Sequence, residues 1–348
     1  MRLLRRPLVS RLLLLALIAA SIAIERGVVL VVPLVFVLIV PLEKLFPRHL
    51  GQRVRRPELG TDVAYALIGP VLNVASIVVG ATLGALTLAW VPGLAMRPLV
   101  SMIPDGLRIV VAFLLFDLLI YWTHRFAHEV PALWRFHAVH HTPKTLDWVS
   151  GFRNHPLDGL IIAPPVFFLI AAGFDPVITG ALAVIQGIVG LLLHANVRWR
   201  LRPLHRVVAT PEFHHWHHAD EADAINSNYA AFLPIWDVIF GSYYMPRRHR
   251  PMSYGISQPM PTDVVGLLSE PMTGLRPGRW ALDVVRYPIR STWRLRRWTA
   301  GLLSEMARSA RRPRRRQIPA GDPLPWTAAR PEPGAAEATV ASAARASS

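Results

Sequence analysis

The most informative residues of this chain are nine histidines that occur in short, regularly spaced groups. They form one HxxxH group, two HxxHH groups and a single histidine between the latter: His124, His128, His137, His140, His141, His194, His214, His217 and His218. Imidazole nitrogens are common ligands of transition metals. Nine of the 14 histidines lie in these groups, a distribution too uneven for ordinary core histidines. The spacing therefore predicts a metal site.

The spacing also indicates how many metals are present. Residues three and four apart share one face of a helix, so each group can direct its histidines to one point. Adjacent histidines, such as His140 and His141, lie about 100° apart around a helix and reach two different ions more easily than one. Two ions with roughly four to six ligands each would use nine imidazoles and keep positions open. Open positions are typical of catalysis.

Composition places this site in a membrane protein. Hydrophobic residues make up 52% of the chain, charged residues 17%, and the mean hydropathy is +0.34, values more apolar than a soluble core needs. The apolar stretches cover 12–24, 27–42, part of 64–91, 107–122, 157–172 and 177–193. We expect the first two to form a tight pair of membrane segments. The last two should form a hairpin that returns His194 to the face of the other histidines.

The basic loop at 44–56 fixes the expected orientation. Its lysine and arginines indicate the cytoplasmic side, and counting crossings from there puts His124 and His128 on the same side. We therefore expect an all-α integral membrane protein with roughly four to six membrane segments and a cytoplasmic, histidine-rich cap that holds a dinuclear metal site.

Longer runs of residues carry a family resemblance. The runs are DLLIYWTHRFAH (117–128), FHAVHHT (136–142), FRNHP (152–156), TPEFHHWHH (210–218), and Asn228-Tyr229 through WDVIFG (236–241). From roughly Leu107 to Tyr244 the chain resembles the fatty acid hydroxylase/sterol desaturase superfamily. The resemblance implies a membrane oxygenase with a di-iron centre held by the nine histidines. It would use O2 and external electrons to hydroxylate or desaturate a lipid of sterol, fatty acyl, alkylglycerol or carotenoid type.

The remaining histidines are expected outside the ligand set. His215 occupies a position where the superfamily often has arginine, and we place it on the other side of its helix. His155 matches a superfamily feature that we interpret as lying behind the ligands or beside the substrate. His49, His205 and His249 are expected to be ordinary interfacial residues.

Two carboxylates are candidates for supporting the ligands. Asp117 lies within an apolar segment, where an ionisable group is costly unless it faces a partner. It could accept the N–H of a ligand imidazole and fix its tautomer, or hydrogen-bond to a neighbouring helix, and the sequence leaves both open. Asp237, beside Trp236, has the same two interpretations, with the structural one preferred.

Oxidation of an unactivated C–H bond requires a redox metal that activates O2. We therefore expect two iron ions, although zinc suits the same imidazoles and could occupy them in a purified sample. A zinc-dependent membrane hydrolase lacks its usual motif, because His128-Glu129 is followed by Val-Pro and does not complete HExxH. A non-catalytic metal-binding membrane protein remains the alternative from another class.

Electrons are expected from a separate protein. The chain has no cysteine, which excludes iron–sulfur clusters and thiolate-ligated haem, and no GxGxxG opens a helix after a strand. A ferredoxin, cytochrome or reductase is therefore implied. The basic cytoplasmic face could dock an acidic one.

The C-terminal region is strongly basic, with eleven arginines between Arg286 and Arg316. Interleaved Trp293 and Trp298 favour an interfacial segment on an anionic leaflet over nucleic-acid binding. We divide the chain into N-terminal membrane segments (1–106), a catalytic domain (107–245), a basic interfacial segment (246–316) and a disordered tail (317–348).

Overall fold

The computed structural model describes residues 7–26, 28–87, 90–199, 204–246, 249–280 and 282. Within them helices dominate, and β-structure is limited to two isolated bridges, so the all-α prediction is confirmed. The long helices are α1 (Pro7–Ile24), α2 (Val28–Leu45), α3 (Leu59–Thr87), α4 (Val91–Ser101), α5 (Asp105–Glu129), α7 (Gly159–Ala171) and α8 (Pro176–His194). The short ones are α6 (Pro131–His137), η1 (Trp148–Phe152), η2 (Pro156–Asp158), α9 (Pro211–His217), α10 (Ile235–Phe240), α11 (Val264–Ser269) and η4 (Glu270–Met272).

Four of the described helices are long and apolar enough to cross a membrane. They are Pro7–Ile24, Leu59–Thr82, Asp105–Glu129 and Pro176–His194, which agrees with the lower end of the expected range. Large apolar side chains on these helices face outward, among them Leu15, Ile77 and Val184. Contiguous exposed apolar surface of this kind is suited to lipid contact.

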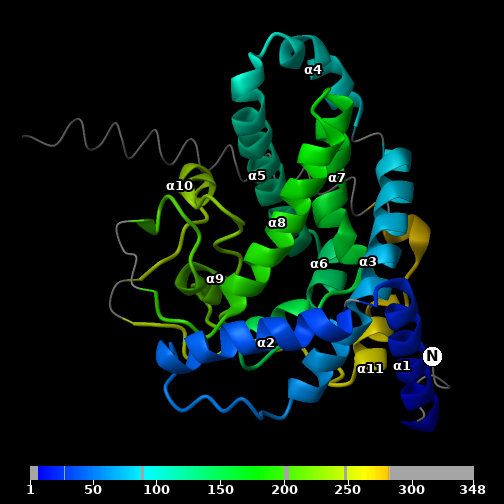
Figure 1. Ribbon diagram of the computed structural model, residues 1–348, viewed down its shortest axis with the longest axis vertical. Helices are drawn as coiled ribbons and strands as arrows, with labels where there is room; N and C mark the ends of the chain where they lie inside the picture. The colour runs from blue at the N-terminus through cyan, green and yellow to red at the C-terminus, as the bar shows by residue number, and fades with distance from the viewer. Residues whose placement is uncertain are drawn as a thin grey trace, which may run out of the picture. The chain divides into compact units, whose positions relative to one another are not determined.

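Helix α7 lies at the centre of the bundle and contacts α3, α4, α5 and α8 (Figure 1). The predicted hairpin is present as α7 and α8. Gly173 turns the chain between them with a positive φ of 93°, a conformation that glycine adopts without steric cost. Asp175 then caps α8 by accepting hydrogen bonds from the backbone N–H groups of Val177 and Ile178. The hairpin brings His194, at the last position of α8, back to the other histidines.

The two N-terminal apolar stretches form separate helices, but not a tight pair. They are divided at residues 25–27, where the charged dipeptide was expected to form the turn. Figure 1 shows α2 running crosswise to α1, α7 and α8. The structure therefore does not reproduce the expected pair of neighbouring membrane segments.

The helix ends near the histidines follow from local sequence. Helix α5 stops at Glu129 because Pro131 forces the residue before it, Val130, into an extended conformation. Helix α6 ends at His137, and residues 138–141 continue in tight turns with i to i+3 backbone hydrogen bonds. The first HxxHH group is thus half helix and half turn, rather than one helix face.

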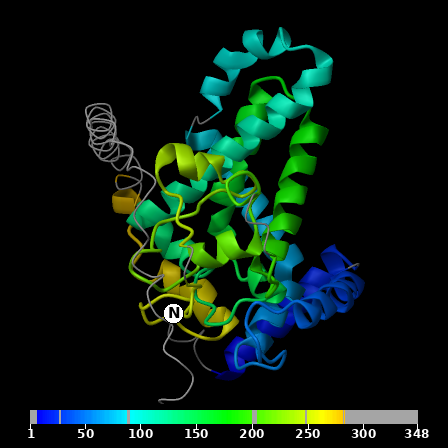
Figure 2. The same ribbon diagram turned by 90° about the vertical axis from the view of Figure 1, so that its left-hand side faces the viewer.

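The segments after α8 build the cap. Thr210 caps α9 by accepting from the backbone N–H of Phe213, and α9 packs against α8. Figure 2 shows the yellow-green segment that follows α8 lying against the helices. Helix α11 then packs against α1 and α3, with Leu267 fully buried. Most of the predicted basic segment and the whole predicted tail lie outside the described residues.

Candidate metal centre

The structure brings all nine predicted histidines into two neighbouring groups. The five-histidine group is His124, His128, His137, His141 and His217, and the four-histidine group is His140, His194, His214 and His218. Within each group, one ring nitrogen of every histidine lies within 4.8 Å of those of the others. Ligands bound at about 2.1 Å on opposite sides of one ion are separated by a similar distance.

Adjacent histidines separate between the two groups, as the helical spacing predicts. His140 belongs to the four-histidine group and His141 to the five-histidine group, and His217 and His218 divide in the same way. The groups are close, because the stacked rings of His141 and His218 have centroids 4.1 Å apart. The arrangement thus offers two adjoining positions for ions.

Hydrogen bonds to Nδ1 fix the tautomers of at least four of these rings. Backbone carbonyls accept from Nδ1 of His124 (Tyr229, 2.8 Å), His140 (Arg153, 3.2 Å), His194 (Gly190, 2.7 Å) and His217 (Ser227, 2.8 Å). A carbonyl can only accept, so Nδ1 carries the proton in each ring. The Nε2 lone pair is therefore free to bind a metal.

Burial keeps the imidazoles neutral. Loss of solvent, reinforced by neighbouring imidazoles, holds the pKa of His140, His141, His214 and His218 well below the ordinary value. Burial lowers the pKa of His217 to about 3. These rings are consequently unprotonated at pH 7, which is the form that coordinates a metal.

The Nε2 atoms of several of these histidines have the environment expected of metal ligands. Nε2 of His128, His141 and His217 is buried without a hydrogen-bond partner in the described part of the chain. Nε2 of His124 lies 3.1 Å from Nε2 of His137. An orphaned buried polar atom costs about 1–3 kcal/mol, and a cation between such lone pairs would remove that cost. The donor set of imidazoles alone suits iron or zinc.

The two predicted carboxylates support the backbone rather than the ligands directly. Asp117 accepts from the backbone N–H groups of Phe232 and Leu233 and from the indole of Trp236. These are the contacts of the structural interpretation, and neither Asp117 nor Asp237 bonds to a histidine among the described residues.

Asp237 holds the same segment from another side. It accepts from the backbone N–H groups of Tyr229 and Ala230 and from the Ser242 hydroxyl, and burial raises its pKa to about 6. Because the Tyr229 carbonyl accepts from His124, both carboxylates act on the centre only through residues 229–233.

The carboxylate that does reach a ligand is Asp158, which sequence reasoning missed. Its Oδ1 lies 3.3 Å from Nδ1 of His137. The only available signal was its position two residues after the FRNHP run. His155, in that run, accepts from the Leu157 backbone N–H and donates to the Leu268 carbonyl. It lies outside the ligand set and lines the cavity described below.

His215 lies outside both groups, on the side of α9 away from them, but it is fully buried. Its Nε2 lies 3.2 Å from the His194 carbonyl, and its Nδ1 lies 3.2 Å from the Tyr254 hydroxyl. His49 also reaches that hydroxyl, at 2.5 Å. His49 is half-buried and lies outside both groups, as expected, but its contact with Tyr254 could not be read from the sequence, because the two residues are far apart in the chain.

The other two histidines differ in exposure. His205 is buried, against expectation, whereas the side chain of His249 is 55% exposed and lies 3.9 Å from Glu221. His249 thus remains the histidine that is most clearly a surface residue.

A buried ion network supports the turn that carries His140. Arg153 pairs with Asp62 and donates to Thr142, and Arg56 bridges Asp62 and Asp147. The Arg153 carbonyl is the acceptor for Nδ1 of His140. The network thus connects the start of α3 to the turn that carries His140, a member of the four-histidine group. The side chain of Arg56, one of the arginines of the basic loop at 44–56, is thus buried.

Three cavities surround the centre. One of about 270 Å³ lies between α3, α5, α7 and α8 and is lined by five of the nine histidines: His124, His137, His140, His194 and His214. A second, of about 310 Å³, reaches His128, His141 and His217 from the cap side. Trp134 lines this second cavity and also a third of about 700 Å³.

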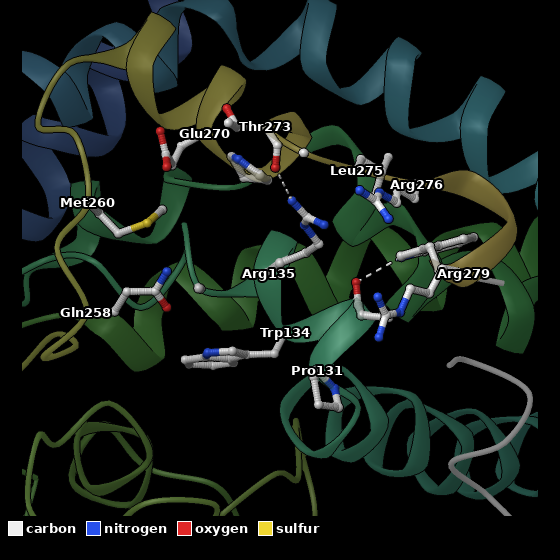
Figure 3. Close-up of a pocket in the computed structure, with 15 residues that line it drawn as sticks. Pro131, Trp134, Arg135, Gln258, Met260, Glu270, Thr273, Leu275, Arg276 and Arg279 are labelled. Atoms are coloured by element: carbon white, nitrogen blue, oxygen red, sulfur yellow. Dashed lines mark hydrogen bonds between the residues drawn. The ribbon is translucent and has the colours of Figure 1, made fainter. Parts of the chain in front are cut away.

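The third cavity is rich in arginine. Figure 3 shows Arg135 beside Trp134, with Arg276 and Arg279 across the cavity. The Trp134 ring lies 5.1 Å from that of His128 and 5.4 Å from that of His141. A single aromatic side chain therefore separates an arginine-lined surface from the five-histidine group.

Comparison with known proteins agrees with this geometry. The profile of the fatty acid hydroxylase family matches residues 109–242. The ornithine lipid hydroxylase OlsE of Rhizobium tropici is 31% identical over 249 residues, which cover 68% of this chain and 72% of the relative. This chain belongs to the fatty acid hydroxylase family. Membership confirms the resemblance found in the sequence and makes the chain an oxidoreductase.

Other relatives are matched over a smaller part of their length. Alkylglycerol monooxygenase of Homo sapiens is 32% identical over 152 residues, 43% of this chain and 33% of that protein. The very-long-chain aldehyde decarbonylase GL1-6 of Oryza sativa subsp. indica is 28% identical over 139 residues, 36% of this chain and 21% of that protein. No solved structure matches the chain.

Proposed function

We propose that this family member is a di-iron membrane oxygenase that uses O2 to hydroxylate or desaturate a lipid. The observation that carries the proposal is the sorting of nine histidines, seven of them buried and two half-buried, into groups of five and four around a cavity between apolar helices. The names of the relatives, a lipid hydroxylase and an alkylglycerol monooxygenase, support a lipid as the substrate class.

The chain's own residues would hold and orient the metals. His124, His128, His137, His141 and His217 would bind one iron, and His140, His194, His214 and His218 the other. When bound, the irons supply the redox chemistry that activates O2 toward an unactivated C–H bond. The carbonyls that accept from Nδ1 keep four of the nine rings, those of His124, His140, His194 and His217, in one tautomer and one orientation, so these ligands need no rearrangement when a metal enters.

The lipid would enter from the bilayer. The cavity of about 270 Å³ is bounded by α3 and α8, two of the helices that are apolar and long enough to span. Exposed apolar side chains on both, such as Ile77 and Ile188, would lie in lipid. A hydrocarbon chain could then reach the histidines without crossing water. A water-soluble alcohol would not need such a route.

Electrons would come from a separate acidic carrier of the ferredoxin, cytochrome or reductase class. Arg135, Arg276 and Arg279 line the cavity in Figure 3 and complement a negative surface. Trp134 links that cavity to His128 and His141 by ring contact. We propose this face as the docking side and, from the basic loop at 44–56, the cytoplasm as the compartment it faces.

The deciding experiment is metal analysis of the detergent-purified chain, combined with Mössbauer or EPR spectroscopy during stepwise reduction. About two irons per chain that cycle with reductant and react with O2 would support the proposal. Zinc that persists through iron-supplemented expression, with no redox signal, would overturn it in favour of a metal-binding protein or a hydrolase. Turnover of a short water-soluble alcohol as readily as of a long-chain lipid would overturn the lipid assignment.

A further inference from the structure

The cavity of about 270 Å³ has a polar position well away from the histidines. Helix α8 lines it with Gln186, Gly187, Gly190, Leu191 and His194, which recur at helical spacing along one face. Gln186 precedes His194 by eight residues, and a helix rises 1.5 Å per residue, so its backbone lies about 12 Å from the metal end. The cavity thus extends along α8 toward the middle of the proposed span.

One atom of the Gln186 side chain lacks a hydrogen-bond partner among the described residues. That atom, Oε1, is buried. An unsatisfied buried amide oxygen costs about 1–3 kcal/mol, and a polar group within an apolar span is costly as well. A glutamine that only joined helices would hydrogen-bond across the interface. The unpartnered atom instead points to a ligand.

Helix α3 adds polar groups across the cavity. Asn73 and Ser76 also line it, and their spacing of three residues places them on one face of α3. The side chains around them are exposed and apolar, including Val74 and Val78. These few polar groups are therefore set in a surface suited to lipid, which is how binding sites fix the position of an otherwise apolar ligand.

Two glycines leave room beside Gln186. A Cβ added at Gly187 or Gly190 would meet no atom within 4 Å, so neither position is glycine because of crowding. Glycine in a helix interior costs about 1 kcal/mol relative to alanine. At both positions the missing side chain widens the cavity, which suits a bulky ligand lying against the backbone of α8.

We propose that Gln186, opposite Asn73 and Ser76, binds a hydrogen-bond donor carried within the hydrocarbon part of the lipid, a hydroxyl or an amide N–H. The inference deepens the proposed function and rests on it. The substrate class is then a lipid with a polar group inside its chain, separated from the carbon that is oxidised by roughly the 12 Å that α8 rises between Gln186 and His194. Plain hydrocarbon chains would leave the amide unpaired and bind less well.

The test measures binding and does not depend on turnover. Stearic acid and its 6-, 9- and 12-hydroxy derivatives would compete with fluorescent cis-parinaric acid for the full, metal-loaded chain in detergent. We expect at least one hydroxystearic acid to bind about tenfold more tightly than stearic acid. Gln186→Leu should remove that preference without weakening stearic acid, while Ile185→Leu, on the exposed side of α8, should keep it.

A second variant tests the cavity itself. Gly187→Leu should lower the affinity for every probe about tenfold, because the new side chain would fill the space. The inference is overturned if no hydroxystearic acid is preferred, or if Gln186→Leu keeps the preference. Either result would leave iron content and lipid oxidation intact as support for the proposed function. Unchanged affinities in Gly187→Leu would show that the lipid lies elsewhere and would overturn the inference, while metal analysis would still decide the proposed function.

Discussion

Single imidazole nitrogens decide what the centre can bind. His128, His141 and His217 each present a buried Nε2 with no partner in the described chain, so removal of one of them deletes a ligand without disturbing a hydrogen bond of that atom. Variants at these positions therefore remove a metal ligand without leaving a partner of that atom unpaired.

We expect His141→Ala and His218→Ala each to lower bound metal by at least half of one ion per chain and to abolish turnover, because each removes a ligand from a different group. Elemental analysis and a lipid-oxidation assay would measure both effects. His249→Ala is the matched control, since its side chain is exposed, and it should change neither. Equal losses in all three variants would contradict the ligand assignment.

His215→Ala should behave differently from both the ligand variants and the control. The ring is fully buried and contacts the His194 carbonyl and the Tyr254 hydroxyl, so its removal leaves a cavity and two unpaired groups. We expect a loss of about 2 kcal/mol in unfolding free energy, seen as a lower midpoint of thermal unfolding. Metal content per folded chain should stay near that of the unaltered protein. A variant as stable as the parent would contradict the structural role.

At the scale of elements, turns and caps place the ligands, and much of this could be predicted. Pro131 predicts the end of α5, and the Gly-Phe-Asp-Pro turn at 173–176 predicts the α7–α8 hairpin, because both signals are local. The division of adjacent histidines between two groups was also predictable, although His140 and His141 lie in the turns after α6 and not on a helix. What could not be predicted depends on contacts between segments far apart in the sequence. Asp158 beside His137, and Tyr254 beside His215, are examples.

The buried ion network of Arg56, Asp62, Asp147 and Arg153 holds α3 to the turn that carries His140, and the sequence did not reveal it. Arg153→Met should leave the Asp62 carboxylate with one partner fewer in a buried site. We expect a loss of about 3 kcal/mol in stability and weaker metal binding by the four-histidine group, because the Arg153 carbonyl orients His140. Unfolding in denaturant and metal titration would test this. Arg53→Met, at an exposed position in the loop that also carries Arg56, is the control that should change neither.

At the scale of the whole molecule, we assign electron-carrier docking to the basic surface and lipid binding to the apolar surface. Raising ionic strength from about 50 to 500 mM should reduce turnover driven by an acidic ferredoxin about tenfold, since screening weakens docking at Arg276 and Arg279. Arg276→Glu should do the same at low salt, and Arg53→Glu should not. Turnover driven by dithionite should be insensitive to salt. Equal salt sensitivity with both reductants would place the effect outside docking.

Metal removal should destabilise the whole cap, because the ligands come from α5, α6, α8, α9 and the turn after α6. Dialysis against a chelator should lower the midpoint of thermal unfolding by about 10 °C or more, and iron should restore it. Differential scanning fluorimetry in detergent would measure the shift. An unchanged midpoint would mean that the cap is already held by its hydrogen bonds and ion pairs.

The distribution of ligands along the chain has a consequence for how the protein is made. His124 and His218 both belong to the centre, with α7 and α8 between them. A ribosome must therefore deliver the α7–α8 hairpin, and then α9, before either metal position is complete. Until that moment the emerging chain carries several unprotected imidazoles at the membrane surface. Neither metal position can be fully liganded until the segment that carries His217 and His218 has been made.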